Sequence, residues 1–246
     1  MRWHPSRASR CGPAPRALGA LGVVMLVLLA RPATAAGRIV TFRAEDGRAL
    51  NALAYEPSQR PSPAVVLVPM LGRPKEDWDA IGQRLADANI LAVAIDLPGV
   101  SDPGDSRVLG AWSGDVRAAI TYVNSRPDVR PGAIGVAGAS VGASLAALAA
   151  ATSRVVRSLV LVSPSLDYRG LRVDATLKQY RGPALLVASA GDPYASRSVR
   201  ELAKDAPGVR DTRFSSVTAH GTLLLARDPD MVNALVEWFQ RTLGVN

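Results

Sequence analysis

The chain has 246 residues, of which 48% are hydrophobic and 20% charged, a balance typical of a globular protein and unlike that of a disordered one. Its 29 Lys and Arg against 21 Asp and Glu give a formal net charge of +8, so the position of this excess decides whether it indicates nucleic-acid or membrane-surface binding. One Cys excludes an intrachain disulfide and a cysteine-based zinc site, and two His leave little room for a histidine-rich metal centre.

The first 36 residues have the pattern of an export signal. They contain five arginines and no Asp or Glu, an apolar run from Leu18 to Ala30, and the small-x-small sequence Ala33-Thr34-Ala35. As a helix the apolar run would span roughly 20 Å, which is short of the ~30 Å hydrocarbon core of a bilayer. We therefore predict a secretory signal peptide over residues 1–35, cleaved after Ala35 or Ala36. An uncleaved anchor is the alternative, because Arg31 puts a charge between the apolar run and the cleavage site.

Cleavage would change both the cysteine count and the charge. Cys11 precedes the apolar run, so the mature chain would hold no cysteine, which suits an oxidising compartment. We expect a periplasmic or secreted protein of a bacterial-type cell, with no stable membrane insertion after cleavage. Loss of the five arginines lowers the net charge to about +3. Aromatic residues are only 5% and no basic helix is evident, so we predict no nucleic-acid binding.

From Gly37 onward, strand-like and helix-like segments alternate. Residues 39–43 and 49–55 alternate in hydropathy around Glu45-Asp46-Gly47, a pattern that predicts a β-hairpin. Continuous apolar runs follow at 64–68 and 90–95, and between them Trp78, Ile81 and Leu85 have helical spacing. The next predicted helix carries Val116, Ile120 and Val123 and stops near Arg126-Pro127.

The second half continues in the same style. We predict strands at 133–139, 158–162, 184–189 and 212–217, and helices from Val141 to about Ala151, around 196–204, and through Met231, Leu235 and Trp238. Continuous Val, Leu and Ile strands between helices indicate a mostly parallel sheet of about eight strands, covered by helices on both faces. We predict one α/β domain over residues 37–246. The polar stretch between 162 and 184 is only about twenty residues long, too few for a separate cap domain.

The strand at 133–139 ends in Gly138-Ala139-Ser140-Val141-Gly142, which has the form G-x-S-x-G. Such a sharp strand-to-helix turn lifts the serine above the sheet edge, and its glycines allow strand and helix to approach closely. The helix N-terminus behind Ser140 would favour a developing negative charge. The alternative is a tight turn with an incidental serine.

The histidine count narrows the search for a catalytic base. His4 lies in the predicted leader, so the mature chain has a single imidazole, His220, between the last predicted strand and the last helix. A hydrolase with a Ser–His pair must use this residue, although a lone histidine is often structural.

Asp192 is the candidate acid. It follows the strand at 184–189 and so gives the chain order Ser, Asp, His. A hydrolase whose serine lies at a strand-to-helix turn of such an α/β sheet requires this order. Its carboxylate would hold the imidazole in one tautomer and stabilise the charged form. Asp167, after the preceding strand, is the rival, and either residue could instead be a turn-forming aspartate.

An oxyanion hole would need two backbone N–H groups. Val141, directly after the nucleophile, is expected to supply one, and the loop Pro69-Met70-Leu71-Gly72 the other. Pro69 has no N–H, so Met70 or Leu71 must serve, and we favour Leu71 from its distance to the strand end. The apolar side chains of this loop could also be buried for packing alone.

Together these residues resemble the α/β-hydrolase family over essentially the whole mature chain. The segments Val68–Gly72, Asp96–Gly99 and Ala219–Thr222 are most similar to the compact, cap-less dienelactone-hydrolase-like branch. The resemblance implies that Gly138–Gly142 is the nucleophile elbow, Asp192 the acid and His220 the catalytic histidine. Two features differ: many relatives have His-Gly where this chain has Pro69-Met70, and dienelactone hydrolases use a cysteine where this chain has Ser140.

The expected function is hydrolysis of a small carboxylic ester or thioester through an acyl-enzyme on Ser140, with no metal or organic cofactor. Short acyl groups are favoured by analogy with a small, lidless fold. A non-catalytic exported binding protein that keeps the fold is the alternative, motivated by the unusual oxyanion loop.

Overall fold

A computed structural model describes residues 1–4, 37–98, 106–204 and 206–245. The chain divides into two units, residues 1–33 and residues 34–246. Of the first unit only residues 1–4 are described, and they contain no helix or strand. The apolar run of the predicted leader, Cys11 and the predicted cleavage site lie outside the described residues, so export stays a prediction.

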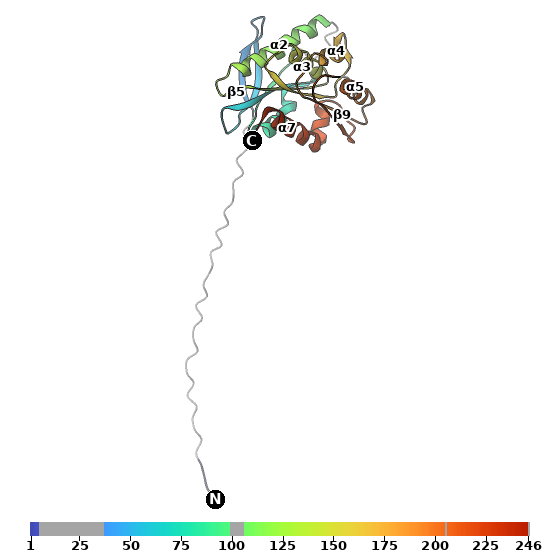
Figure 1. Ribbon diagram of the computed structural model, residues 1–246. Helices are drawn as coiled ribbons and strands as arrows, with labels where there is room; N and C mark the ends of the chain where they lie inside the picture. The colour runs from blue at the N-terminus through green and yellow to red at the C-terminus, as the bar shows by residue number, and fades with distance from the viewer. Residues whose placement is uncertain (5–36, 99–105, 205, 246) are drawn as a thin grey trace. The chain divides into compact units, whose positions relative to one another are not determined.

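The second unit is built on an eight-stranded sheet in the order β1-β2-β4-β3-β5-β6-β9-β10 (Figure 1). The strands are β1 Arg38–Arg43, β2 Ala49–Tyr55, β3 Ser62–Val68, β4 Leu91–Ile95, β5 Val129–Ala139, β6 Val156–Val162, β9 Ala184–Ser189 and β10 Arg210–Ser215. β1 and β2 form the predicted hairpin, β2 pairs antiparallel with β4, and every other pair is parallel. The predicted mostly parallel α/β sheet is confirmed.

Helices cover both faces of this sheet, and Figure 1 shows α2 and α3 on the side opposite α7. The helices are η1 Lys75–Trp78, α1 Asp79–Asp87, α2 Ser106–Ser125, α3 Val141–Thr152, α4 Val173–Leu177, α5 Pro193–Ala203, α6 Thr222–Arg227 and α7 Pro229–Leu243. One core joins α2, α3, α4 and α5 to the sheet, and the other joins α1, α6 and α7 to it. None of the helices within the described ranges combines the length and the apolar character that crossing a membrane requires.

The two cores explain the continuous apolar strands. Along β3, Val66 and Val68 belong to the first core, while Val65 and Leu67 belong to the second. Because successive side chains of a strand point to opposite faces, a strand buried on both sides needs an apolar residue at every position. This is why hydropathy predicted these strands so well.

Sequence analysis missed several short elements and misplaced the end of the last strand. The polar stretch after β6 contains a small hairpin, β7 Asp167–Tyr168 with β8 Leu171–Arg172, and the short helix α4. The last strand ends at Ser215 instead of residue 217, and the loop after it contains α6. In α6, Leu224 and Leu225 are buried while Leu223 is 37% exposed. Such short elements form because tertiary packing holds them, and they span too few residues to show a periodicity.

The strand order positions the crevice above the sheet. β3 and β5 are neighbours, with Val68 opposite Gly138 at their carboxyl ends. The chain leaves β3 toward α1 in one core and leaves β5 toward α3 in the other. In an open α/β sheet, a reversal of this kind separates the two connections and opens a site above the carboxyl ends of the strands.

Candidate active site

Ser140 lies in a strained turn between β5 and α3. Its backbone has φ 55° and ψ −118°, a region that residues with a side chain rarely occupy. The turn is held by the Ser140 N–H, which donates to the Val162 carbonyl at 2.9 Å, and by the Ala143 N–H, which donates to the Ser140 carbonyl at 2.9 Å. Strain of this kind costs about 1–3 kcal/mol and persists only where the surroundings impose it.

Two glycines make this turn possible. A Cβ at Gly138 would lie 2.1 Å from the carbonyl oxygen of Gly142, so strand and helix could not approach as they do. A Cβ at Gly142 would lie 2.3 Å from the carbonyl oxygen of Pro69. The second glycine therefore also lets the loop after β3 approach the start of α3.

Ser140 and Asp192 both lie within hydrogen-bonding distance of His220, although the three residues come from three separate loops. The Oγ of Ser140 is 2.8 Å from Nε2 of His220, and Nδ1 of His220 is 2.5 Å from Oδ2 of Asp192. The His220 side chain is 43% exposed and the Asp192 side chain 18%. The arrangement can relay a proton between a serine hydroxyl and an imidazole that stays open to solvent.

Asp192 has a second partner, while its rival Asp167 lies elsewhere. The Oδ1 of Asp192 accepts the N–H of Ala195 at 3.1 Å and so caps the N-terminus of α5, with Pro193 in the first turn. Asp167 is exposed in the β7–β8 hairpin, where its Oδ1 accepts the N–H of Gly170 at 2.8 Å. Asp167 therefore acts as a turn aspartate.

The loop that carries His220 is held by a buried serine that sequence analysis missed. Ser163 follows β6, has φ 49° and is only 2% exposed. Its Oγ accepts the N–H of Gly221 at 3.0 Å, and its own N–H donates to the carbonyl of Val187 at 2.7 Å. Because β6 lies between β5 and β9, this serine anchors the histidine loop as it extends from β10 toward Ser140.

The loop after β3 lies against both the elbow and the histidine loop. A Cβ at Gly221, which has φ 59°, would lie 2.7 Å from the Sδ of Met70. Within the described residues, the backbone N–H groups of Val141, Met70 and Leu71 donate to no protein acceptor. All three predicted oxyanion donors are therefore free, and Met70 and Leu71 both stay candidates for the second position.

A partly buried carboxylate joins the same two loops, and no sequence motif indicated it. The Oδ2 of Asp77, in η1, accepts the hydroxyl of Thr222 at 2.8 Å. Arg73 donates through Nε and Nη2 to the two oxygens of Asp77, at 2.7 and 2.8 Å. Burial of Asp77 opposes ionisation, but the bonds from Arg73 and Thr222 outweigh it, so the pKa of Asp77 lies below its ordinary value.

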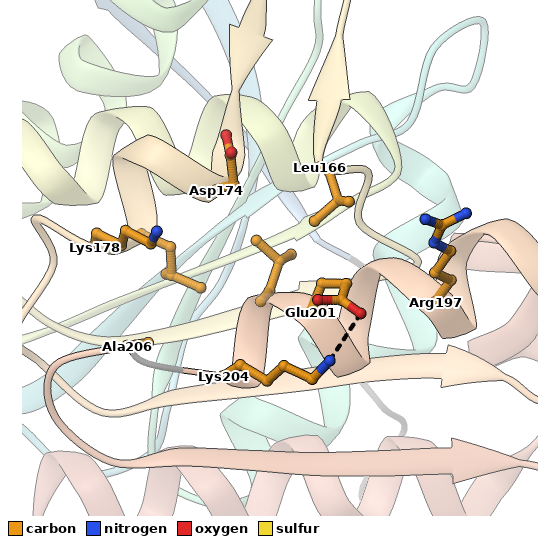
Figure 2. Close-up of a pocket in the computed structure, with 9 residues that line it drawn as sticks. Leu166, Asp174, Lys178, Arg197, Glu201, Lys204 and Ala206 are labelled. Atoms are coloured by element: carbon orange, nitrogen blue, oxygen red, sulfur yellow. Dashed lines mark hydrogen bonds and ion pairs between the residues drawn. The ribbon is translucent and has the colours of Figure 1, made fainter.

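A surface pocket of about 330 Å³ lies between α4 and α5, and none of the three residues Ser140, Asp192 and His220 lines it (Figure 2). Figure 2 shows the ion pair of Glu201 and Lys204 along one side, with Lys178 and Arg197 toward opposite ends. The two charged groups of the pair are 2.9 Å apart.

Within the described residues no group of three or more His, Cys, Asp or Glu side chains could hold a metal ion.

A family model described as "Alpha/beta hydrolase family" matches residues 65–243. The chain belongs to the alpha/beta hydrolase family. That match includes the elbow, the loop after β3, Asp192 and His220. Family membership supports a hydrolase as the class of protein, and no curated protein matches the chain.

Solved α/β-hydrolase structures have the same fold. DcsB, determined in complex with its substrate analogue, has 16% identity and a TM-score of 0.73, covering 85% of this chain and 99% of its own. A dienelactone hydrolase from Anabaena variabilis has 16% identity and a TM-score of 0.68, covering 84% and 97%. EstE1, a thermophilic carboxylesterase from a metagenomic library, has 20% identity and a TM-score of 0.64, covering 85% and 89%. At these identities the likeness establishes the fold, and it includes the dienelactone-hydrolase-like branch that the sequence resembles.

Proposed function

We propose that the protein is a serine hydrolase that cleaves a small carboxylic ester or thioester through an acyl-enzyme on Ser140. The observation that carries this proposal is the chain of contacts from Ser140 Oγ to His220 Nε2, 2.8 Å, and from His220 Nδ1 to Asp192 Oδ2, 2.5 Å. The three residues belong to a chain of the alpha/beta hydrolase family.

In the proposed reaction His220 takes the hydroxyl proton of Ser140 as Oγ attacks the carbonyl carbon of the substrate. Asp192 orients the imidazole and stabilises its charged form. The tetrahedral intermediate collapses when His220 gives its proton to the leaving alcohol or thiol, which leaves an acyl group on Ser140. A water molecule then attacks the acyl-enzyme while His220 takes its proton, and His220 returns that proton to Ser140 Oγ as the bond to the acyl group breaks and the carboxylic acid departs.

The negative charge of the intermediate needs two donors. The free N–H of Val141, at the N-terminus of α3, is well suited to be the first, and that of Leu71 or Met70 to be the second. Two such donors are worth several kcal/mol of transition-state stabilisation, since loss of one typically lowers kcat by about 10²- to 10³-fold. Free donors beside Ser140 favour catalysis over a binding role that only retains the fold.

Substrate size is inferred from access. The His220 side chain is 43% exposed, and the segment between β6 and β9 holds only a two-stranded hairpin and the five-residue helix α4. No large cap in this segment would enclose a long lipid chain. We therefore favour small esters and thioesters, in keeping with the names of EstE1 and the dienelactone hydrolase among proteins of similar fold.

We further propose that the protein is exported and that residues 1–35 are removed. The support is the basic, apolar and small-residue pattern of the leader. This cleavage is tested by intact-mass measurement and N-terminal sequencing of the protein recovered from a bacterial-type cell that exports it. A new terminus at Ala36 or Gly37 is expected, and an intact Met1 would refute cleavage.

Labelling with a fluorophosphonate tests the catalytic proposal. The wild-type protein should be labelled once and should hydrolyse short acyl esters or thioesters, while Ser140→Ala should do neither and yet give the same circular dichroism spectrum. A folded wild-type protein that reacts with no serine-hydrolase probe would favour the alternative, an exported binding protein that retains the fold. Full labelling of Ser140→Ala would reject Ser140 as the nucleophile.

A further inference from the structure

Two loops must keep a fixed distance for the proposed chemistry, because one carries His220 and the other carries Met70 and Leu71. The two loops follow β10 and β3, which lie far apart in the strand order. Neither loop is part of the sheet ladder at that point. Their relative position therefore depends on contacts outside the sheet ladder, and hydrogen bonds of side chains are among these contacts.

Asp77 connects these loops directly. On one side it accepts the hydroxyl of Thr222, two residues after His220, at 2.8 Å. On the other side its two oxygens accept hydrogen bonds from the guanidinium of Arg73. The backbone N–H of Arg73 in turn donates to the carbonyl of Met70 at 3.2 Å. A continuous path of hydrogen bonds thus runs from the turn that begins at Met70, through one carboxylate, to the start of α6.

The half of this path between Thr222 and Asp77 is shielded from water, whereas the Arg73 side chain is 43% exposed. Thr222 is 1% exposed and the Asp77 side chain 12% exposed, so water competes poorly for the bond between them. Thr222 is also the first residue of α6, whose Leu224 and Leu225 are packed in the core. A shift of the Thr222 hydroxyl would therefore move the beginning of α6 and the neighbouring His220 together.

We propose that Asp77 is a positioning residue, which fixes the loop carrying His220 against the loop carrying Met70 and Leu71 through its bonds to Thr222 and Arg73. The inference rests on the proposed function, since it assigns Asp77 a part in the geometry of that site. Within the part of the chain that the structure describes, the Asp77 side chain has hydrogen bonds to Arg73 and Thr222 and none to Ser140, Asp192 or His220. Its effect is exerted on the distance between the base and the oxyanion donors.

The test compares four variants of the full-length chain. Thr222→Val removes the hydroxyl and nearly keeps the shape, whereas Thr222→Ser keeps the hydroxyl. Asp77→Ala removes the acceptor, and the double variant Asp77→Ala/Thr222→Val removes both partners. Because misplacement by about 1 Å can cost 10²-fold in rate, we expect Thr222→Val and Asp77→Ala to lower kcat by about 10- to 100-fold with KM changed less than about twofold. Thr222→Ser should recover kcat to within about threefold of wild type.

The double variant tests whether Asp77 and Thr222 act through the hydrogen bond between them. If the two side chains act through one hydrogen bond, the double variant should be no slower than Asp77→Ala alone, which a double-mutant cycle measures directly. Multiplied losses in the double variant would mean that the two residues act independently, and would overturn the inference.

Asp128→Ala is the matched control. Asp128 accepts a similar fork from Arg126, at 2.9 and 2.8 Å, and its side chain is 22% exposed, but it precedes β5 at the opposite end of that strand from Ser140. This variant should lower the melting temperature and leave kcat unchanged. If Asp128→Ala lowers kcat as much as Asp77→Ala does, the losses reflect stability and the inference fails.

The labelling of wild type separates the two proposals. If fluorophosphonate does not label the wild-type protein, the proposed function fails, and the role of Asp77 falls with it. If wild type is labelled and hydrolyses ester, but Thr222→Val and Asp77→Ala keep kcat within about twofold, the proposed function stands and the positioning role of Asp77 is overturned.

Discussion

Asp192 uses its two carboxylate oxygens for two different purposes. Oδ2 lies 2.5 Å from Nδ1 of His220, and Oδ1 accepts the N–H of Ala195 at 3.1 Å. The carboxylate that contacts the histidine is thus itself fixed by the first turn of α5. A substitution can preserve one of these bonds and lose the other, which lets the two roles be measured separately.

Asp192→Asn should keep the helix cap and lose the orientation of His220. Its amide oxygen can still accept from Ala195, and asparagine caps helices about as well as aspartate. Its NH2 group would then face Nδ1 and favour the tautomer with the proton on Nε2, which cannot accept the proton of Ser140. We expect kcat to fall by about 10⁴-fold.

Asp192→Ala provides the comparison for that result. It loses the cap as well, at a cost of about 1 kcal/mol in the free energy of unfolding, whereas Asn should change stability by only a few tenths. Urea denaturation and ester hydrolysis measure the two effects. An Asp192→Asn variant as active as wild type would contradict the orienting role.

The strain at Ser140 predicts a stability difference between two variants at this position. Ser140→Ala keeps a Cβ at φ 55°, ψ −118°, whereas Ser140→Gly removes it. Glycine tolerates positive φ, so Ser140→Gly should be more stable than Ser140→Ala by about 0.5–1 kcal/mol, although glycine elsewhere usually destabilises. Thermal denaturation of both variants checks the order, and a less stable glycine variant would show that the turn is not strained.

Gly142→Ala should damage both the fold and the site. Its Cβ would lie 2.3 Å from the carbonyl oxygen of Pro69, so the loop after β3 must move away from α3. We expect a loss of stability of about 1–3 kcal/mol, as for other overpacked positions, together with at least about a tenfold loss of kcat.

Gly110→Ala is the matched control for that substitution. Gly110 is also helical, in α2, but a Cβ there would meet nothing within 4 Å. Alanine should therefore stabilise the helix by up to about 1 kcal/mol and leave kcat unchanged. Equal melting temperatures for Gly142→Ala and wild type would contradict the close approach at Gly142.

Asp115 should make the protein less stable as the pH rises. It is 1% exposed, and its Oδ2 has no hydrogen-bond partner among the described residues. Burial raises its pKa above the ordinary value of 3.8, although Arg48, 2.8 Å away, acts in the opposite direction. The folded state holds the Asp115 proton more tightly than the unfolded state does. The contribution of Asp115 to the free energy of unfolding therefore falls as the pH rises above about 3.8.

Asp115→Asn removes that titration. The variant should therefore gain stability relative to wild type between pH 4 and pH 7, as measured by urea denaturation at both values. Other carboxylates, such as Asp77, have lowered pKa values and act with the opposite sign, but they are common to both proteins and cancel in the comparison. A difference between variant and wild type that is the same at both pH values would contradict the raised pKa.

The sheet could be predicted from sequence because its signal is local. A strand buried on both faces must be apolar at each position, and 184–189 was predicted with the boundaries that β9 has. Helix starts were less accurate: α5 begins at Pro193, three residues before the predicted start, because Asp192 caps it. The elements that were missed, β7, β8, α4 and α6, are too short for a period to emerge.

The candidate site shows the same division. By itself the sequence determined a serine between two glycines at a strand end, one histidine outside the leader, and an acid in the required order, because residue type and chain order are local information. Only the tertiary structure decided between Asp192 and Asp167 as the partner of His220. It alone also revealed the supports of the histidine loop, Ser163 with Gly221 and Asp77 with Thr222, which are 58 and 145 residues apart in the chain. No pattern in the sequence links such pairs, because the hydrogen bonds exist only once the sheet has brought its strand ends to one edge.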